Sequence, residues 1–285
     1  MKLTKAVITA ASPDHRSLPI QTLVDRDGVS RSVLEILLRE IHSTGIEDVC
    51  LVIHPGDEAA FRRAIADTPV RLTFIAQEER LGYGHALSLA ADFIKGEPFF
   101  HAVGDHLFIS SDAKRSCAQQ LIELATLEDC SMSAVQSTRE TEIQHYGTIA
   151  GSLERSSSGE AIYAIKDVIE KPTPTEAEQK LIVPGLRAGR YLTYFGMHVL
   201  SPLVMEILKE SVRDAASSGG KVQLSPVLAE LARRERYTAL KVQGSRQDLS
   251  QKYGLFHAQL ALALVGSEST AVMQDILEIV ARSRQ

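Results

Sequence analysis

The 285-residue sequence has no tryptophan, and aromatic residues make up only 5% of the chain. Cysteine is scarce as well. The three cysteines, Cys50, Cys117 and Cys130, lie far apart and form no C-x-x-C pair, which excludes the spacing of a disulfide framework or a zinc ribbon. No apolar run approaches the length of a membrane span. We therefore expect a cytoplasmic protein without a membrane partner.

An excess of positive charge is also missing, because 31 lysines and arginines face 36 aspartates and glutamates, a formal net charge of −5. Such a chain has no general attraction for nucleic acid, so we expect no nucleic-acid partner. What is present is the composition of an ordinary globular protein, 44% hydrophobic and 24% charged.

β-branched runs and helical patterns alternate through the first half of the chain. The runs "KAVITA", "DVCLVIH", "VRLTFIAQ" and "PFFHAVGD" have the composition of strands, and the segment "SRSVLEILLREIHSTG" has apolar residues at helical spacing. This rhythm predicts an α/β fold with a Rossmann-like, mainly parallel sheet flanked by helices. From about residue 131 longer strands joined by turns follow, and residues 202–285 are largely helical. The sheet is therefore expected to be mixed, with a helical C-terminal part.

Three turns follow predicted strand ends, which is where ligands of such sheets bind. They lie after Ala10, around Gly82 and at Asp105. The first turn, "AASPDHR", has none of the glycines that let a backbone approach phosphates closely. Because no G-x-G-x-x-G follows the first strand, a dehydrogenase-type dinucleotide site is disfavoured.

Each of the chemical features has two interpretations when it is taken alone. The glycines around Gly82 either free the backbone ahead of a ligand-binding helix N-terminus or form an ordinary turn. Asp105 either binds a divalent metal that rides on nucleotide phosphates or caps the next helix. Glu170 and Lys171 either hold sugar hydroxyls and a phosphate or form an exposed charged pair. Asp248 lies between a predicted strand and helix, where aspartate is an ordinary N-cap.

The combination of these features resembles the bacterial UTP–glucose-1-phosphate uridylyltransferases and, more broadly, the sugar-phosphate nucleotidyltransferases. That family has a first strand leading into G-x-G-T-R, a glutamine five residues before G-L-G-H-A, and V-x-E-K-P. This chain has "KAVITAA", Gln77 at the same interval before "GYGHA", and then "GDH", "HYGTIAG", "VIEKP", "FGMHVLSP" and "DLSQKYG". The resemblance covers essentially the whole chain.

Carried over position by position, the resemblance implies a role for each candidate residue. The nucleotide would be bound by Ala10, Ala11, Gln77 and Gly82, and the sugar by Glu170, Gly147 and Gly196. Mg²⁺ would be bound by Asp105 and Asp248. Lys171 would hold the sugar phosphate, and Arg16 would steady the leaving pyrophosphate. Arg16, Lys171 and Asp105 would thus be the catalytic set.

The family also implies an overall organisation and a reaction. One nucleotidyltransferase domain of the glycosyltransferase-A type would span residues 1–265, with a nucleotide-binding half over about 1–130 and a sugar-phosphate half over about 131–265. A C-terminal helix over 266–285 would follow, and its apolar stripe would either pair two copies or pack on its own domain. The substrates would be UTP or another nucleoside triphosphate and a sugar 1-phosphate, with UDP-glucose the expected product. The family tends to form dimers or tetramers, so a homodimer or homotetramer is expected.

The departures from the family pattern cluster in the opening loop. Ser12 and Asp14 replace its glycines and His15 replaces its threonine, while Arg16 remains. Asp14 adds a negative charge where triphosphate oxygens would lie, which should weaken their binding.

A phosphate-binding lysine of the family is also missing near Gln21, and Arg26 or Arg31 is the nearest substitute. These losses leave two hypotheses open. One is an active nucleotidyltransferase, and the other is a catalytically weak or inactive relative that binds a sugar nucleotide or acts in regulation.

Overall fold

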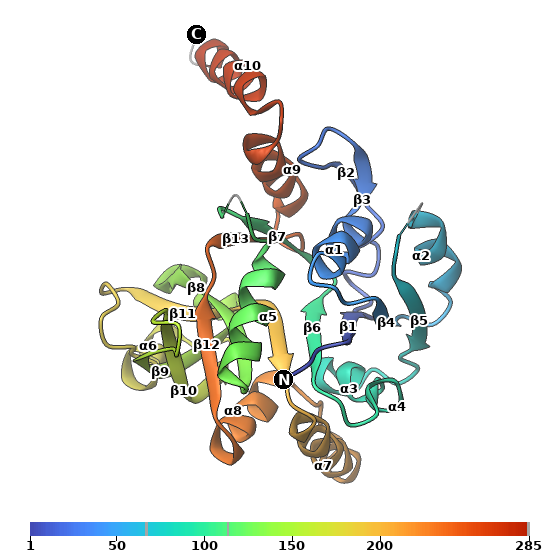
Figure 1. The fold of residues 1–285 in the computed structure, drawn as a ribbon, viewed down its shortest axis with the longest axis vertical. Coiled ribbons are helices and arrows are strands. Elements are labelled where there is room, and N and C mark those ends of the chain that lie inside the picture. Colours follow the sequence, from blue (N-terminus) through green and yellow to red (C-terminus); the bar gives the residue numbers. More distant parts are fainter. Residues whose placement is uncertain (66–67, 113, 284–285) are drawn as a thin grey trace.

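The computed structural model describes residues 1–65, 68–112 and 114–283. A nine-stranded sheet runs through the molecule (Figure 1), with strands from the first part of the chain at one end and strands from later parts at the other. In spatial order the strands are β5 (Arg71–Ala76), β4 (Asp48–Ile53), β1 (Lys5–Ala10), β6 (Phe99–Val103), β11 (Arg190–Leu200), β8 (Ser131–Arg139), β12 (Tyr237–Lys241), β10 (Ala161–Glu170) and β9 (Gly147–Arg155).

The two halves of the sheet differ in strand direction. β5, β4, β1 and β6 are all parallel, as the alternation of strands and helices predicts. Beyond β6 most pairs are antiparallel, with β12 and β8 as a parallel exception. The expected Rossmann-like mixed sheet is confirmed.

Helices cover both faces of the sheet. One face carries α1 (Val33–His42), α2 (Glu58–Ala64) and α5 (Cys117–Glu128), and the other carries α3 (Tyr83–Ser88), α4 (Ala91–Ile94), α7 (Leu203–Ser218) and α8 (Leu224–Arg234). α1 begins where its sequence pattern predicts, because the Ser32 side chain accepts a hydrogen bond from Glu35 N at 3.0 Å and caps the helix. Two apolar cores result, one on each side of the sheet.

Smaller elements complete the fold at one end of the sheet. β13 (Gly244–Asp248) pairs antiparallel with β7 (His106–Ser110), and β2 (Thr22–Val24) pairs with β3 (Ser30–Ser32). The remaining helices are η1 (Glu140–His145), a 3₁₀-helix, and α6 (Pro174–Lys180), α9 (Gly254–Val265) and α10 (Ser269–Arg282). α9 packs against β2 and β7, whereas α10 extends away from the body of the molecule (Figure 1).

None of the helices in the described ranges is both long and apolar enough to cross a lipid bilayer.

Candidate active site

The candidate site lies at the carboxyl edge of the parallel strands. The turn between β6 and β7 lies against the end of β1, because Gly104 N donates to Thr9 O at 2.9 Å. A Cβ on Gly104 would lie 2.9 Å from Ala10 Cβ, so this approach requires glycine. The turn after Ala10 and the turn that carries Asp105 are therefore neighbours in space, as predicted for this edge of the sheet.

Asp105 lies in the turn between β6 and β7, so the interpretation that it caps a helix is wrong. His15 Nδ1 lies 3.1 Å from Asp105 Oδ2, and His106 Nδ1 lies 2.8 Å from Asp105 Oδ1. Burial opposes ionisation of Asp105, but His106 and His15 outweigh it and hold the pKa of that carboxyl well below its usual range. The hydrogen bond with Asp105 raises the pKa of His15.

Asp248 is brought to the same place by the short β7–β13 pair. It lies opposite His106 in that pair, and the adjoining Leu249 N donates to Asp105 O at 3.0 Å. The residue that caps α9 is Tyr253, so the interpretation of Asp248 as a helix cap is also wrong. Asp105 and Asp248, distant in sequence, thus flank one turn.

The Asp248 carboxylate closes a local turn. Its Oδ1 accepts from Ser250 N at 3.0 Å and from Ser250 Oγ at 2.6 Å, and its Oδ2 accepts from Gln251 Nε2 at 3.0 Å. Burial works against ionisation here as well, but His106 and these hydrogen bonds lower the pKa of Asp248. Both acidic side chains are therefore ionised at neutral pH.

The chemistry of this donor set fits Mg²⁺. Magnesium takes one or two carboxylates in proteins and completes its octahedron with water and phosphate oxygens. Asp105 and Asp248 supply two such carboxylates side by side. Across the described residues, no group of three or more His, Cys, Asp or Glu side chains is arranged to hold a metal by itself. A cation bound here would therefore depend on ligand phosphates as well.

Two residues beside Asp248 were not predicted from the sequence. The guanidinium carbon of Arg246 lies 3.5 Å from the centre of the Tyr146 ring, and Arg246 Nη1 donates to Tyr194 O. Burial raises the pKa of Tyr146 to about 12, and Asp248 acts in the same direction against Arg246. The one available signal was strand alternation in "GSRQD", which places Arg246 and Asp248 on the same side of β13.

Gln77 and Gly82, which the resemblance places at the nucleotide base, are held together in the structure. Gln77 Nε2 donates to Gly82 O at 3.1 Å and lies 3.1 Å from His85 Nδ1. Gly82 has a φ of +104°, and a Cβ there would lie 2.6 Å from Val222 O. A close approach of the chain itself therefore requires this glycine. Its contact with a base stays a prediction.

Glu170, Gly147 and Lys171 come together at the end of the β9–β10 hairpin. Glu170 is the last residue of β10 and lies opposite Gly147, and its Oε2 accepts a hydrogen bond from Ser225 Oγ. Lys171 is exposed and has a φ of +50°, while its N donates to Tyr146 O at 3.2 Å. A left-handed backbone is uncommon for lysine and is often found at ligand sites.

Gly196 lies in β11, where the register with β8 shifts between Tyr194 and His198. Its φ is +96°, and a Cβ would lie 2.8 Å from Val103 Cγ2 and 3.5 Å from the Phe108 ring. The chain's own packing therefore requires this glycine as well, and its place in a sugar pocket stays a prediction.

The opening loop takes a conformation that needs no glycine. The described non-glycine residues with positive φ are Lys95, Asp129 and Lys171, so Ser12 and Asp14 have ordinary backbone angles. A turn forms as His15 N donates to Ser12 O at 3.2 Å. The loop therefore has ordinary backbone geometry, and its His15 side chain contacts Asp105 in the candidate site.

Arg16, predicted to steady pyrophosphate, is held at the neighbouring strand end. Its Nη2 donates to Asp57 Oδ1 at 2.7 Å, and its Nη1 lies 3.2 Å from His54 Nδ1. Asp57 is 8% exposed, and its Oδ2 has no hydrogen-bond partner. Arg16 is therefore engaged by the protein itself, while His15, the preceding residue, engages Asp105.

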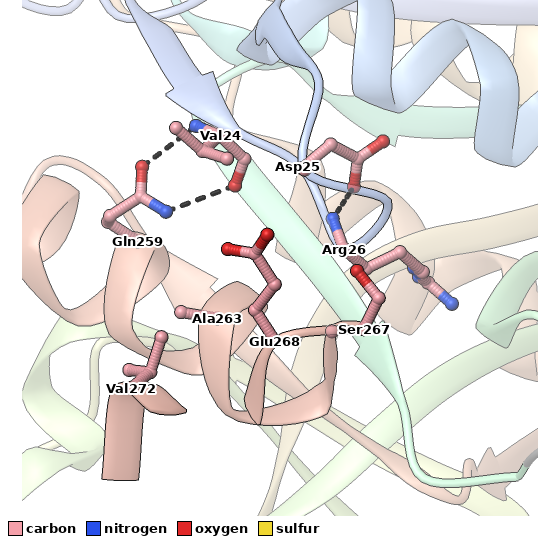
Figure 2. Close-up of a pocket in the computed structure, with 10 residues that line it drawn as sticks. Val24, Asp25, Arg26, Gln259, Ala263, Ser267, Glu268 and Val272 are labelled. Carbon is pink, nitrogen blue, oxygen red and sulfur yellow. Dashed lines mark hydrogen bonds between the residues drawn. The ribbon is translucent and has the colours of Figure 1, made fainter. Parts of the chain in front are cut away.

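Of the two substitutes suggested for the missing lysine, Arg31 is held by acidic side chains, whereas Arg26 is an exposed side chain at the edge of a pocket. Arg31 Nη1 donates to Asp25 Oδ2 at 3.0 Å and to Asp27 Oδ1 at 2.5 Å. Arg26 lines a pocket of about 220 Å³ between the β2–β3 hairpin and the junction of α9 with α10 (Figure 2). Beside this pocket, the Gln259 side chain forms hydrogen bonds with both the N and the O of Val24. These two bonds join the hairpin to α9.

A parallel sheet with two ionised aspartates at its carboxyl edge is the arrangement of a nucleotide-binding α/β enzyme. The model of the nucleotidyl transferase family matches residues 23–249. The chain therefore belongs to the nucleotidyl transferase family, and the resemblance seen in its motifs is confirmed.

Curated relatives agree with this assignment, and solved structures share the fold. The chain is 28% identical to the UTP–glucose-1-phosphate uridylyltransferase YngB of Bacillus subtilis, over 98% of this chain and 96% of the relative. It is 27% identical to the corresponding enzyme of Streptococcus pneumoniae, over 92% and 91%. A UDP-glucose pyrophosphorylase solved with UDP-glucose superposes with a TM-score of 0.73 at 24% identity, covering 91% of this chain and 98% of that one. A UTP-bound enzyme from Acinetobacter baumannii gives a TM-score of 0.74 at 21% identity, covering 97% and 99%.

Proposed function

We propose that this protein transfers a uridylyl group from UTP to glucose 1-phosphate, forming UDP-glucose and releasing pyrophosphate. The observation that carries the proposal is the pairing of Asp105 with Asp248 at the carboxyl edge of the sheet, both held ionised. The names of the curated relatives support the choice of base and sugar.

The proposed reaction is an in-line displacement. An oxygen of the sugar phosphate attacks the α-phosphorus of UTP, the bond between that phosphorus and the bridging oxygen breaks, and pyrophosphate leaves with the bonding electrons. No proton has to be transferred, so catalysis consists of alignment and neutralisation of charge. Glu170 would hold the sugar hydroxyls, Lys171 the sugar phosphate and Arg16 the departing pyrophosphate.

Asp105 and Asp248 would hold Mg²⁺, which would supply positive charge to neutralise the phosphates. Because both carboxyls have lowered pKa values, neither has to lose a proton before it can act as a ligand. His15 has to release Asp105 Oδ2 before that oxygen can reach a cation.

A second candidate function is that of a catalytically weak or inactive relative that binds a sugar nucleotide or acts in regulation. Two contacts of the opening loop favour this function: His15 lies against Asp105, and Arg16 donates a hydrogen bond to Asp57. Binding of a triphosphate has to displace both contacts.

One assay separates the two functions. The protein is incubated with UTP, glucose 1-phosphate and Mg²⁺, and pyrophosphate release is measured. Turnover that disappears in Asp105→Ala supports the enzyme. Absence of turnover across common nucleotides and sugar phosphates, together with measurable binding of UDP-glucose, supports the second function instead.

We also propose that the protein forms a homodimer, or a homotetramer built from such dimers, through α10. This 14-residue helix buries none of its residues, and Met273, Leu277, Ile279 and Val280 are exposed on it. Isolated helices of this length are marginal in water, so a second copy that covers the apolar side chains would stabilise it. Light scattering should give at least twice the chain mass, and Leu277→Asp should halve the measured mass.

The proposed setting is the cytoplasm. The three cysteines are free and buried, a state that a reducing compartment preserves. Fractionation of cells with an antibody against this chain tests the location.

A further inference from the structure

The segment between α7 and α8 lies across the nucleotide-side turn. Val222 N donates to Leu81 O at 2.7 Å, and Gly84 N donates to Val222 O at 2.8 Å. A Cβ on Gly84 would lie 2.7 Å from Val222 Cγ1, as close as a Cβ on Gly82 would lie to Val222 O at 2.6 Å. Two main-chain hydrogen bonds and two glycines thus fix the position of Val222, and with it the start of α8.

Three residues further on, the same segment reaches the sugar side. Ser225 is in the first turn of α8, is 3% exposed, and donates its hydroxyl to Glu170 Oε2. A Cβ on Gly147 would lie 2.6 Å from Ser225 Oγ and 3.3 Å from Glu170 Oε2. The absence of a side chain at Gly147 therefore leaves the space in which Ser225 and Glu170 meet.

This contact decides which atoms of Glu170 are available to a ligand. A glutamate side chain has several rotamers, and a hydrogen bond from a buried, immobile donor selects one of them. Oε2 is then used within the protein, and Oε1 is left to accept from a ligand hydroxyl. Ser225 supplies a single donor and is itself held in place through Val222.

We propose that Ser225 is a positioning residue that sets the carboxylate of Glu170 for sugar recognition. The inference rests on the proposed function, in which Glu170 binds sugar hydroxyls. Its consequence is a selective effect: loss of the Ser225 hydroxyl weakens binding of ligands that contain the sugar and spares UTP.

Calorimetry with glucose 1-phosphate, UDP-glucose and UTP tests the proposal. Ser225→Ala should weaken binding of the two sugar ligands by roughly tenfold or more, because a misplaced polar group costs that much in a preorganised site. Binding of UTP should change by less than about twofold, since UTP carries no such sugar. Ser225→Thr keeps the hydroxyl and should bind both sugar ligands within about threefold of the wild type.

Ser131→Ala is the matched control. Ser131 Oγ donates to Glu235 Oε1, so the variant removes the same kind of serine–glutamate hydrogen bond at a position outside the candidate site. It should bind all three ligands like the wild type. If Ser225→Ala does not fold, Ser225→Cys replaces it, because a thiol of similar size is a weak donor and should show the same selective loss.

Several results would overturn the inference. These are an equal loss of UTP and sugar-ligand binding in Ser225→Ala, no loss of either, or failure of the threonine variant to retain sugar binding. A wild-type protein that binds UTP but neither sugar ligand also overturns it. A wild-type protein that binds UDP-glucose but releases no pyrophosphate contradicts the proposed enzyme instead, and the binding comparison then still decides the role of Ser225.

Discussion

The opening loop and the surroundings of Glu170 represent two different kinds of site within one sheet. In the loop, His15 contacts Asp105 and Arg16 donates to Asp57. A bound metal would need Asp105 to be freed from His15, and a bound triphosphate would need Arg16 to be freed from Asp57. Around Glu170, the buried Ser225, the glycine opposite and the end of β10 already hold one arrangement. The proposed sugar side is therefore preorganised, whereas the proposed phosphate side has to exchange internal contacts for ligand contacts. That exchange should lower the affinity for UTP relative to UDP-glucose.

The largest expected effect comes from Asp105 and Asp248, the pair proposed to bind the metal. Asp248→Asn should lower the rate of pyrophosphate release by about a thousandfold, because the site loses one of two charges placed for the cation. Steady-state kinetics with UTP and glucose 1-phosphate measures it. Asp112→Asn, at an aspartate paired with Arg115 outside the site, is the control and should keep its rate. A loss of less than tenfold in Asp248→Asn would show that Asp105 suffices.

Acid should lower the stability of the sheet on which both regions lie, because a histidine pair is buried in it. His101 in β6 stacks on His198 in β11 with ring centres 5.8 Å apart. Burial lowers the pKa of His101 to about 4, and burial lowers that of His198 well below its usual value. The unfolded chain then binds more protons than the folded one between pH 6.5 and about 4, so stability falls as the pH drops through this window.

The expected size of this acid effect is roughly 3 kcal/mol for His101 at the lower end of the window. Urea denaturation at several pH values measures it, and stability should be level with respect to these two groups above pH 6.5. A single transition reported by probes in both regions is expected. Separate transitions would show that the nucleotide and sugar halves unfold independently.

A substitution at Arg16 tests whether this side chain leaves Asp57 to bind pyrophosphate. Arg16→Ala should weaken pyrophosphate binding by roughly tenfold, the loss of one charge-assisted hydrogen bond, and should leave glucose 1-phosphate binding unchanged. Calorimetry with the two ligands measures both. Arg62→Ala is the control, because Arg62 pairs with Glu58 on the exposed side of α2. Unchanged pyrophosphate binding in Arg16→Ala would mean that Asp57 keeps Arg16 even when the ligand is present.

The smallest expected effect concerns His15. His15→Ala removes the imidazole from Asp105 Oδ2 and should raise the affinity for a divalent cation by a few-fold, because the cation no longer competes with an internal donor. Binding of Mn²⁺ followed by electron paramagnetic resonance measures it without turnover. Weaker Mn²⁺ binding in the variant would instead identify His15 as a supporting group of the metal site.

Local sequence patterns were sufficient to predict much of the fold. The apolar spacing of α1 and the strand runs before each turn are visible without tertiary information, and the motif resemblance brought Asp105 and Asp248 together. The division of the chain at about residues 130 and 265 stays a prediction. Ser225, Tyr146 and Arg246 were not predictable as a group, because a single serine or arginine has no local pattern and their contacts arise only when distant strands pair.

The glycines show why a motif and its physical cause have to be separated. For Gly82 the sequence left open a backbone freed for a ligand or an ordinary turn, and the atom that needs the space is Val222 O. The opening loop lacks the glycines that let a backbone approach phosphates, and Ser12 and Asp14 adopt ordinary backbone angles there. At Gly82 the residue type was informative, but the reason for it lies in a segment far away in the sequence.

The short β7–β13 pair has a consequence for how this protein is made. It joins residues 106–110 to residues 244–248, so the acidic pair is assembled by one of the most non-local contacts in the chain. Closing so long a loop is entropically costly and slow compared with forming the parallel strands at the N-terminus. On a ribosome, the N-terminal strands can pair early, but the acidic pair cannot form until residue 248 has emerged. A nascent chain halted before that point would expose the carboxyl edge of the sheet with Asp105 present and Asp248 still missing.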